Sequence, residues 1–363
     1  MSSTSTDWRR LYPFESHYLD RGPLRYHYLD EGRGEPVVMV HGNPTWSFYF
    51  RELIIALRGD YRCIACDHIG CGLSDKPGDD GYSYRLESRV DDLDALMEHL
   101  GLTEDVTLVL HDWGGMIGMA WALRRPERIK RLIVMNTAAF LLPQVVAQSG
   151  HRLHPNCGTG VPPVSPPARR RCHSDIHKAR SVSTSVAPVS KSVAPVSKTV
   201  APVSNRCGRP AKRLPLRLRL LHGGGPFASV AVRGFNLFSR AAVSMATTKR
   251  LAPDVRAGLM APYDSWKNRI ATLRFVEDIP LSPKHPSYAL AKSVDESIKR
   301  FADVPMLICW GERDFVFDAD FLAEWRRRFP KAEVHTFPDA GHYVLEDAGE
   351  EIIPLVTGFL SRL

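Results

Sequence analysis

Long apolar runs and secretion signals are missing from this sequence of 363 residues. No stretch approaches the roughly 20 apolar residues that a membrane-spanning helix needs. Residues 1–7 lack the basic start and following apolar stretch of a secretory signal peptide. We therefore expect a cytoplasmic protein with no integral membrane segment.

Paired cysteines and the usual cofactor motifs are also missing. The seven cysteines are odd in number and scattered, so they do not indicate a disulfide framework. Cys63 and Cys66 form a Cys-x-x-Cys pair, but no second ligand pair follows at the spacing of a zinc site. Gly70 and Gly72 lack the third glycine of a dinucleotide-binding loop. The sequence therefore predicts no metal and no cofactor.

Acidic residues are scarce in one segment, and this accounts for the formal net charge of +8. Residues 149–210 hold ten basic residues and a single acid, Asp175, so this segment carries +9 and the rest of the chain −1. The basic balance belongs to one insert and not to the catalytic part of the chain. We expect no nucleic-acid partner.

Aromatic residues are absent from the repeats inside this insert. Three near-identical heptads, SVAPVSK, SVAPVSK and TVAPVSN, cover 185–205. The proline in each repeat excludes a regular helix, and the repeats have no aromatic side chain with which to build a core. We predict a disordered, low-complexity basic insert over 143–210, with a short β-like stack as the alternative. The histidines and cysteines of the insert are too irregularly spaced to indicate a metal site.

Outside the insert, apolar segments typical of buried strands alternate with helical segments. The expected strands cover 17–20, 24–30, 36–40, 63–66, 106–110, 129–135, 306–310 and 334–337. This alternation predicts an α/β fold with a doubly wound, mostly parallel sheet. We expect the two parts of the core at 1–142 and 303–363. The alternation breaks between them, where we expect a helical cap at 211–302.

The most informative motif is His111-Asp112-Trp113-Gly114-Gly115, which follows the apolar run 106–110. It places an acid where a strand turns sharply into a helix, which is the position of the nucleophile in an α/β-hydrolase fold. A carboxylate that attacks carbon forms an ester with the protein, and this ester must then be opened. Asp112 therefore favours substrates with a leaving group on saturated carbon, or with a strained ring, over ordinary esters.

Such a nucleophile works with a histidine that activates water and an acid that orients the histidine. His342 follows the apolar segment 334–337 and precedes the last helical segment, where this fold carries its base. Asp314 follows the preceding strand, and the chain order of nucleophile, acid and histidine is that of α/β-hydrolases. Asp318 is the competing candidate for the acid.

Asn43 and Trp113 are candidates for holding the leaving group. Asn43 offers a side-chain amide N–H, and Trp113, next to the expected nucleophile, offers an indole N–H. Two neutral donors that converge near a carbon under attack suit a departing halide or a developing oxyanion.

The chain resembles the haloalkane dehalogenase family of α/β-hydrolases over nearly its whole length except the insert. The segments that carry this resemblance are 41–47, 67–77, 111–115, 310–314 and 341–342. Segments 46–49 and 67–72 are most similar to the third subfamily. That branch is similar to the β-lactone decarboxylases of bacterial long-chain olefin biosynthesis.

This resemblance implies a role for each candidate residue. It makes Asp112 the nucleophile, His342 the base, Asp314 the acid, and Asn43 with Trp113 the halide-stabilising pair. Another branch of the family takes its acid after the preceding strand, but residues 135–137 of this chain include no carboxylate. The role of the acid therefore falls to Asp314.

The leading hypothesis is a haloalkane dehalogenase: Asp112 displaces a halide, and water activated by His342 opens the alkyl ester. The main alternative is a cis-3-alkyl-4-alkyloxetan-2-one decarboxylase, in which the same carboxylate opens a cis-β-lactone with release of carbon dioxide and a cis-alkene. Both imply a small apolar substrate and leave open an oligomer or an assembly with enzymes of one pathway. The further alternatives are an epoxide hydrolase that uses Tyr263 or Tyr288, and a catalytically silent scaffold built on the basic insert.

Overall fold

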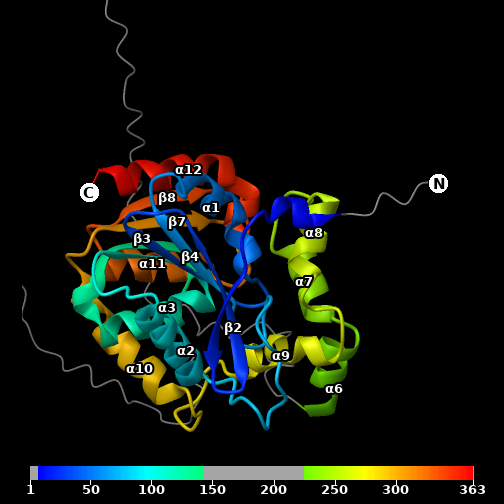
Figure 1. Cartoon of the computed structure of the whole chain (residues 1–363). Coiled ribbons are helices and arrows are strands. Elements are labelled where there is room, and N and C mark those ends of the chain that lie inside the picture. The colour runs from blue at the N-terminus through cyan, green and yellow to red at the C-terminus, as the bar shows by residue number, and fades with distance from the viewer. Residues whose placement is uncertain (1–6, 142–224, 363) are drawn as a thin grey trace, which may run out of the picture. The chain divides into compact units, whose positions relative to one another are not determined.

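An eight-stranded sheet forms the centre of the computed structural model, which describes residues 7–141 and 225–362 (Figure 1). The strands are β1 (His17–Arg21), β2 (Leu24–Glu31), β3 (Pro36–Val40), β4 (Arg62–Cys66), β5 (Val106–Asp112), β6 (Ile129–Thr137), β7 (Met306–Gly311) and β8 (Glu333–Phe337). Their order in the sheet is β1-β2-β4-β3-β5-β6-β7-β8. All neighbours from β4 to β8 are parallel, whereas β2 runs antiparallel to both β1 and β4.

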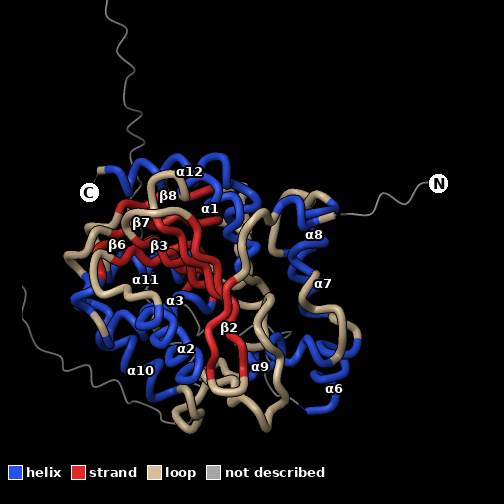
Figure 2. The backbone as a smooth tube through the Cα atoms, viewed as in Figure 1, coloured by secondary structure: helices blue, strands red, loops and turns tan. Residues whose placement is uncertain are grey.

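Helices cover both faces of this sheet (Figure 2). They are α1 (Arg51–Leu57), α2 (Leu86–His99), α3 (Trp113–Arg124), α6 (Gly225–Ser229), α7 (Leu237–Met245), α8 (Pro253–Met260), α9 (Ile270–Glu277), α10 (Tyr288–Ser297), α11 (Ala319–Arg328) and α12 (Val344–Ser361). Short 3-10 turns form at η1 (Trp8–Leu11), η2 (Ser47–Phe50), η3 (Pro126–Arg128), η5 (Lys267–Arg269) and η6 (Ile298–Phe301), and a π-helical turn at η4 (Val230–Gly234).

Two apolar cores lie on the two faces of the sheet. Helices α2, α3, α10 and α11 contribute side chains to one core, and α1 and α12 to the other. Successive side chains of a strand point to opposite faces, so Val38 and Val40 of β3 join the first core while Val37 and Met39 join the second. Strands buried on both faces have near-continuous apolar sequences. This is why apolar runs alone predict them.

Helices α6 to α9 lie beside the sheet, between β6 and β7 in the chain (Figure 1). Two side chains of the loop after β3 hold α8 and α9. The Trp46 indole donates to the Gly258 carbonyl oxygen at 3.0 Å, and the Asn43 amide donates to the Thr272 carbonyl oxygen at 3.1 Å. The helices after residue 225 therefore contact the carboxyl end of β3, where the expected catalytic loops begin.

The expected doubly wound, mostly parallel sheet is confirmed, with a strand at each expected position. Helices also occupy 225–302, but α10 packs against α3, and its Ala291 and Val294 belong to the core of the sheet layer. The cap boundaries at 211 and 302 therefore stay a prediction. The predicted insert, 143–210, lies outside the described residues. None of the described helices is both long and apolar enough to cross a membrane.

Candidate active site

Asp112 occupies the sharp turn between β5 and α3. Its φ of 52° lies in the left-handed region, which a residue other than glycine rarely adopts, and α3 begins at the next residue. Helix α3 also lies very close to the sheet. A Cβ atom at Gly114 would collide with the Val40 carbonyl oxygen, and one at Gly115 with the Thr137 side chain. The two glycines therefore permit the close packing that holds the turn in its strained conformation.

Asp112 is 7% exposed as a residue, and its carboxylate is held from two sides. The Asn43 backbone N–H donates to Oδ1 at 2.6 Å, and His342 Nε2 lies 3.4 Å from Oδ2. Burial by itself raises the pKa of Asp112, but the hydrogen bond and charge of His342, assisted by the Asn43 amide, lower it below its usual value. Asp112 is thus an anion at neutral pH, which a nucleophile must be.

His342 bridges Asp112 and Asp314. Its Nδ1 lies 2.8 Å from Asp314 Oδ2, and the Asp314 side chain is fully buried. Asp314 Oδ1 accepts the backbone N–H groups of Val316 at 2.6 Å and Phe317 at 3.1 Å. The other candidate acid, Asp318, caps α11 by accepting the Asp320 N–H at 3.0 Å. The geometry therefore brings Asp314, and not Asp318, to His342.

The electrostatics of this bridge favour a charged imidazole in the resting site. Burial works against the charge on His342, but Asp314 and Asp112 together raise its pKa from 6.5 to about 10. Esterification of Asp112 would remove one of these two negative charges. The pKa of His342 would then fall, and this would prepare the imidazole to accept a proton from water.

Stability should therefore depend on pH through His342. A pKa raised in the folded state stabilises the fold fully below the unfolded value of 6.5, and this contribution is lost as the pH rises to about 10. We expect the free energy of unfolding to fall between these limits more steeply for the native chain than for His342→Gln. Urea unfolding of both proteins at several pH values checks this. Parallel curves would contradict a charged His342 in the folded state.

The backbone of His342 is fixed by a second histidine. His111 Nε2 lies 2.9 Å from the His342 carbonyl oxygen, and the Tyr49 ring stacks on the His111 ring with centroids 4.3 Å apart. Burial, and to a smaller extent the neighbouring His342, lower the pKa of His111 to about 3. His111 is therefore neutral and donates its Nε2–H to this carbonyl. It holds the loop without competing for the proton on His342.

Asn136, at the carboxyl end of β6, is a site residue that the sequence analysis did not single out. Its Nδ2 donates to Asp314 Oδ2 at 2.9 Å and to the Gly311 carbonyl oxygen at 3.0 Å, and its Oδ1 accepts the Gly311 N–H at 2.8 Å. The side chain is completely buried. Asn136 thus contacts the same Asp314 oxygen as His342 and fixes the orientation of this carboxylate. The sequence feature that could have indicated Asn136 is its position as a polar residue directly after the apolar part of β6, the strand next to β5.

Removing this amide should weaken both the site and the fold. Asn136→Ala removes the acceptor of the Gly311 N–H and leaves His342 as the sole donor to Asp314 Oδ2 among the described residues, and each lost buried hydrogen bond costs about 1–3 kcal/mol. We expect a loss of turnover of about 10- to 100-fold and a lower free energy of unfolding, measured by steady-state kinetics and urea unfolding. Asn136→Gln is the matched control for loss of the amide itself. Unchanged turnover in Asn136→Ala would exclude a role in orienting Asp314.

The two expected leaving-group donors lie beside Asp112, but the structure uses them differently. The Asn43 side-chain amide donates one N–H to the Thr272 carbonyl oxygen, and the Asn43 backbone N–H donates to the Asp112 carboxylate. The Trp113 indole N–H donates to no residue in 7–141 or 225–362, and the Trp113 ring packs on Phe275 of α9 with centroids 5.5 Å apart. The Trp113 indole N–H is therefore without an acceptor among the described residues. Asn43 has one amide hydrogen left.

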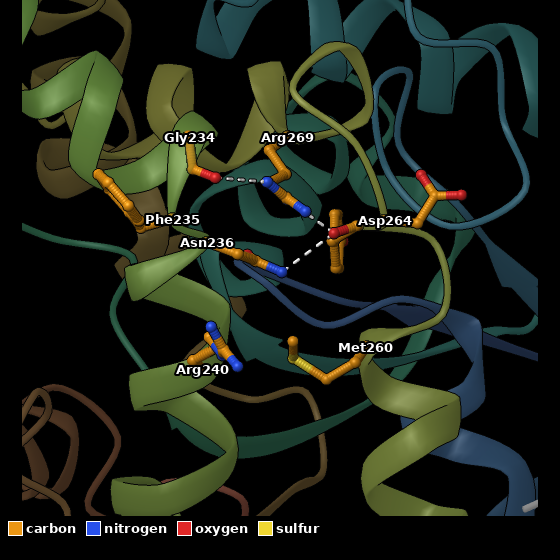
Figure 3. A pocket seen from close by; sticks show the side chains of 8 residues that line it. Gly234, Phe235, Asn236, Arg240, Met260, Asp264 and Arg269 are labelled. Carbon is orange, nitrogen blue, oxygen red and sulfur yellow. Dashed lines mark hydrogen bonds between the residues drawn. The ribbon is translucent and has the colours of Figure 1, made fainter.

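A pocket of about 410 Å³ opens among the helices after residue 225 (Figure 3). Its lining residues are Gly234, Phe235, Asn236, Arg240, Met260, Tyr263, Asp264 and Arg269. Arg269 and Asn236 both donate to the Tyr263 carbonyl oxygen, at 2.8 and 3.0 Å. The Tyr263 hydroxyl donates to the Thr45 carbonyl oxygen at 3.3 Å, so Tyr263 joins this pocket to the loop that carries Asn43. Tyr288 starts α10, which packs on α3.

Comparisons with known proteins agree with this geometry. The α/β hydrolase fold family matches residues 35–154 and 219–349. A cis-3-alkyl-4-alkyloxetan-2-one decarboxylase of Shewanella oneidensis is 43% identical over 353 residues, which cover 97% of this chain and 90% of that protein. A haloalkane dehalogenase of Mycolicibacterium paratuberculosis is 30% identical over 366 residues, which cover 97% of this chain and 94% of that one.

Among solved structures, a loop variant of the haloalkane dehalogenase DbeA from Bradyrhizobium elkanii has a similar fold. Its TM-score is 0.70 at 22% identity, and the alignment covers 96% of each chain. The resemblance to haloalkane dehalogenases and to β-lactone decarboxylases is thus confirmed by relatives of both kinds. The chain belongs to the α/β-hydrolase family.

Proposed function

We propose that this protein is a decarboxylase of cis-3-alkyl-4-alkyloxetan-2-ones, with Asp112 as nucleophile. The observation that carries the proposal is the 43% identity to a decarboxylase of that substrate along nearly the whole chain, against 30% to a haloalkane dehalogenase over a similar length. The decarboxylase, which was the main alternative from the sequence, thus becomes the proposed function, and the haloalkane dehalogenase becomes the second candidate. The same carboxylate serves both reactions.

In the first step Asp112 attacks C4, the ring carbon that carries the lactone oxygen. The new bond from the carboxylate to C4 forms with inversion while the bond from C4 to the ring oxygen breaks. The released electron pair converts the lactone carbonyl into a free carboxylate on C3, and opening the strained ring favours this step. The Trp113 indole and the remaining amide hydrogen of Asn43 can donate to the new anion.

In the second step the bond between C3 and the carboxylate carbon breaks and carbon dioxide leaves. Its electron pair forms the C3–C4 double bond, and the ester bond from C4 to Asp112 breaks to restore the carboxylate. Asp112 bonds to C4 with inversion, and the Asp112 carboxylate and carbon dioxide then leave from opposite sides. The net result is the same as loss of carbon dioxide from one face of the lactone ring, so a cis-lactone gives a cis-alkene. The balance requires no water, proton or cofactor.

Displacement of halide is the second candidate, and the position of His342 favours it. An alkyl ester on Asp112 that lacks a carboxylate cannot eliminate in this way and must be hydrolysed. His342 Nε2 lies 3.4 Å from Asp112 Oδ2 and its Nδ1 is bonded to Asp314. This arrangement suits a base for that water. We therefore expect a bromoalkane to be turned over as a secondary substrate.

Incubation of the purified protein with a cis-3,4-dialkyloxetan-2-one tests the proposal. We expect cis-alkene and carbon dioxide in equal amounts, measured by gas chromatography, and none from Asp112→Ala. A 3-hydroxy acid as the main product would mean hydrolysis and would overturn the decarboxylase. Release of bromide from 1-bromodecane without any reaction of the lactone would establish the second candidate instead.

A further inference from the structure

Arg89 is a completely buried arginine, and two of its three donor nitrogens have no partner in the described part of the chain. It lies on α2 with no exposed surface, and its Nη1 donates to Asp278 Oδ2 at 3.1 Å. No residue in the described part of the chain accepts a hydrogen bond from its Nε or Nη2. Asp278 compensates the charge of Arg89, but burying charged donors that make no hydrogen bond is still costly. An anion that accepts hydrogen bonds from Nε and Nη2 during the reaction would remove this cost.

The guanidinium of Arg89 lies near the ring of Trp113, the residue that follows Asp112. The guanidinium carbon of Arg89 is 3.8 Å from the centre of the Phe275 ring and 5.9 Å from that of Trp113. Phe275 itself packs on Trp113. The charge of Arg89 also acts on His68, which follows β4. Burial and His41 lower the pKa of His68, and Arg89 lowers it more.

The geometry of the unused edge selects the kind of anion. Nε–H and Nη2–H lie side by side in the plane of the guanidinium, and this fork matches the two oxygens of a carboxylate. A halide is a single atom and makes poor use of a planar fork. Ring opening of a β-lactone, as proposed above, creates a carboxylate next to C4.

We propose that the Nε and Nη2 edge of Arg89 is the carboxylate-binding site of this enzyme. This inference rests on the proposed function and extends it, because it assigns the choice of lactones over haloalkanes to Arg89. Trp113 and Arg89 hold the emerging carboxylate together. Asp278 offsets the charge of Arg89, so the fork stabilises ring opening without holding the carboxylate too firmly to lose carbon dioxide.

Arg85 supplies a matched control because it binds the same partner from outside. Its Nη1 donates to Asp278 Oδ1 at 3.2 Å, but its side chain is 43% exposed. The Ser287 hydroxyl also donates to Asp278, at 2.6 Å, so this carboxylate keeps partners when either arginine is replaced. We therefore compare Arg89→Met, Arg89→Lys and Arg85→Met.

Binding of dodecanoate and of dodecan-1-ol by calorimetry is the direct test. We expect the native protein to prefer the carboxylate by about 10- to 100-fold, the range of a charge-assisted hydrogen-bonded pair. Arg89→Met should lose this preference, Arg89→Lys should retain only part of it, and Arg85→Met should retain it in full. Equal preference in the native protein and in a folded Arg89→Met variant would overturn the proposal. So would a loss of equal size in Arg85→Met.

Kinetics on the two substrate types gives a second measurement. Arg89→Met should lower kcat for lactone decarboxylation by about 100-fold and lower bromide release much less. An equal loss on both substrates would mean a structural role and contradict the assignment. If the native protein makes no alkene but its carboxylate preference depends on Arg89, the proposed function fails and the binding site stands. The two failures are thus distinguishable.

Discussion

Asp112→Ala is expected to abolish alkene formation from a cis-β-lactone and bromide release from a bromoalkane together. In the proposed mechanisms both reactions begin with attack by this carboxylate, so we expect losses of about 10⁴-fold or more, as when the nucleophile of a hydrolase is removed. The measurement is the initial rate of each product. Asp112→Asn should lose less over long incubations, because a buried amide that hydrolyses restores the acid.

A control for folding belongs with this test. Asp112 has φ 52° and its backbone carbonyl accepts a hydrogen bond from Thr137, so its main chain is held independently of the carboxylate. Both Asp112 variants should unfold cooperatively, near the denaturant concentration of the native protein. Alkene formed by a folded Asp112→Ala protein at more than a small fraction of the native rate would exclude covalent catalysis by this residue.

His342→Phe is expected to separate the two reactions. With a bromoalkane, Asp112 can still displace the halide, but no base activates water. The alkyl ester should therefore accumulate, with one equivalent of bromide released and the adduct visible in the intact mass. With a cis-β-lactone, elimination frees Asp112 without water. Alkene should continue to form, about 100-fold more slowly because the imidazolium no longer stabilises the returning carboxylate.

Labelled water provides an independent measurement of the same distinction. In H₂¹⁸O, a single turnover of bromoalkane should place the heavy isotope in the Asp112 carboxylate, since water attacks the carboxyl carbon of the ester. A single turnover of lactone should leave Asp112 unlabelled. Label in Asp112 after alkene formation would contradict the elimination step. Equal loss of both reactions in His342→Phe, with no adduct, would contradict the proposal that His342 is required for hydrolysis of the ester but not for elimination.

Strong local signals explain how much of the fold could be predicted from the sequence. The central strands are buried on both faces, so each is an apolar run that needs no tertiary information to be recognised. The turn at Asp112 was predictable because Gly114 and Gly115 are required by close packing. His342 and Asp314 each follow a predicted strand, which places them at the same edge of the sheet.

Residues whose role depends on contacts between segments far apart in the sequence were harder to predict. Asn43 donates to Thr272, 229 positions along the chain, and nothing local indicates this contact. Asn136 became visible only through its contact with Asp314. Arg89 did leave a trace, since it lies three residues after Leu86 and four before Leu93 on the apolar face of α2. A charged residue on such a face indicates a buried partner or ligand.

The placement of His342 between two carboxylates has a consequence for the timing of product departure. In the resting protein the three groups sum to one negative charge, and esterification of Asp112 removes it. An anion formed while Asp112 is esterified and His342 still carries its proton is retained by electrically neutral surroundings. When the ester is cleaved the negative charge returns and repels whatever anion is left. In the proposed catalytic cycle this returning charge helps to expel the product anion, and halide or carboxylate inhibitors should bind the alkylated protein more tightly than the free one.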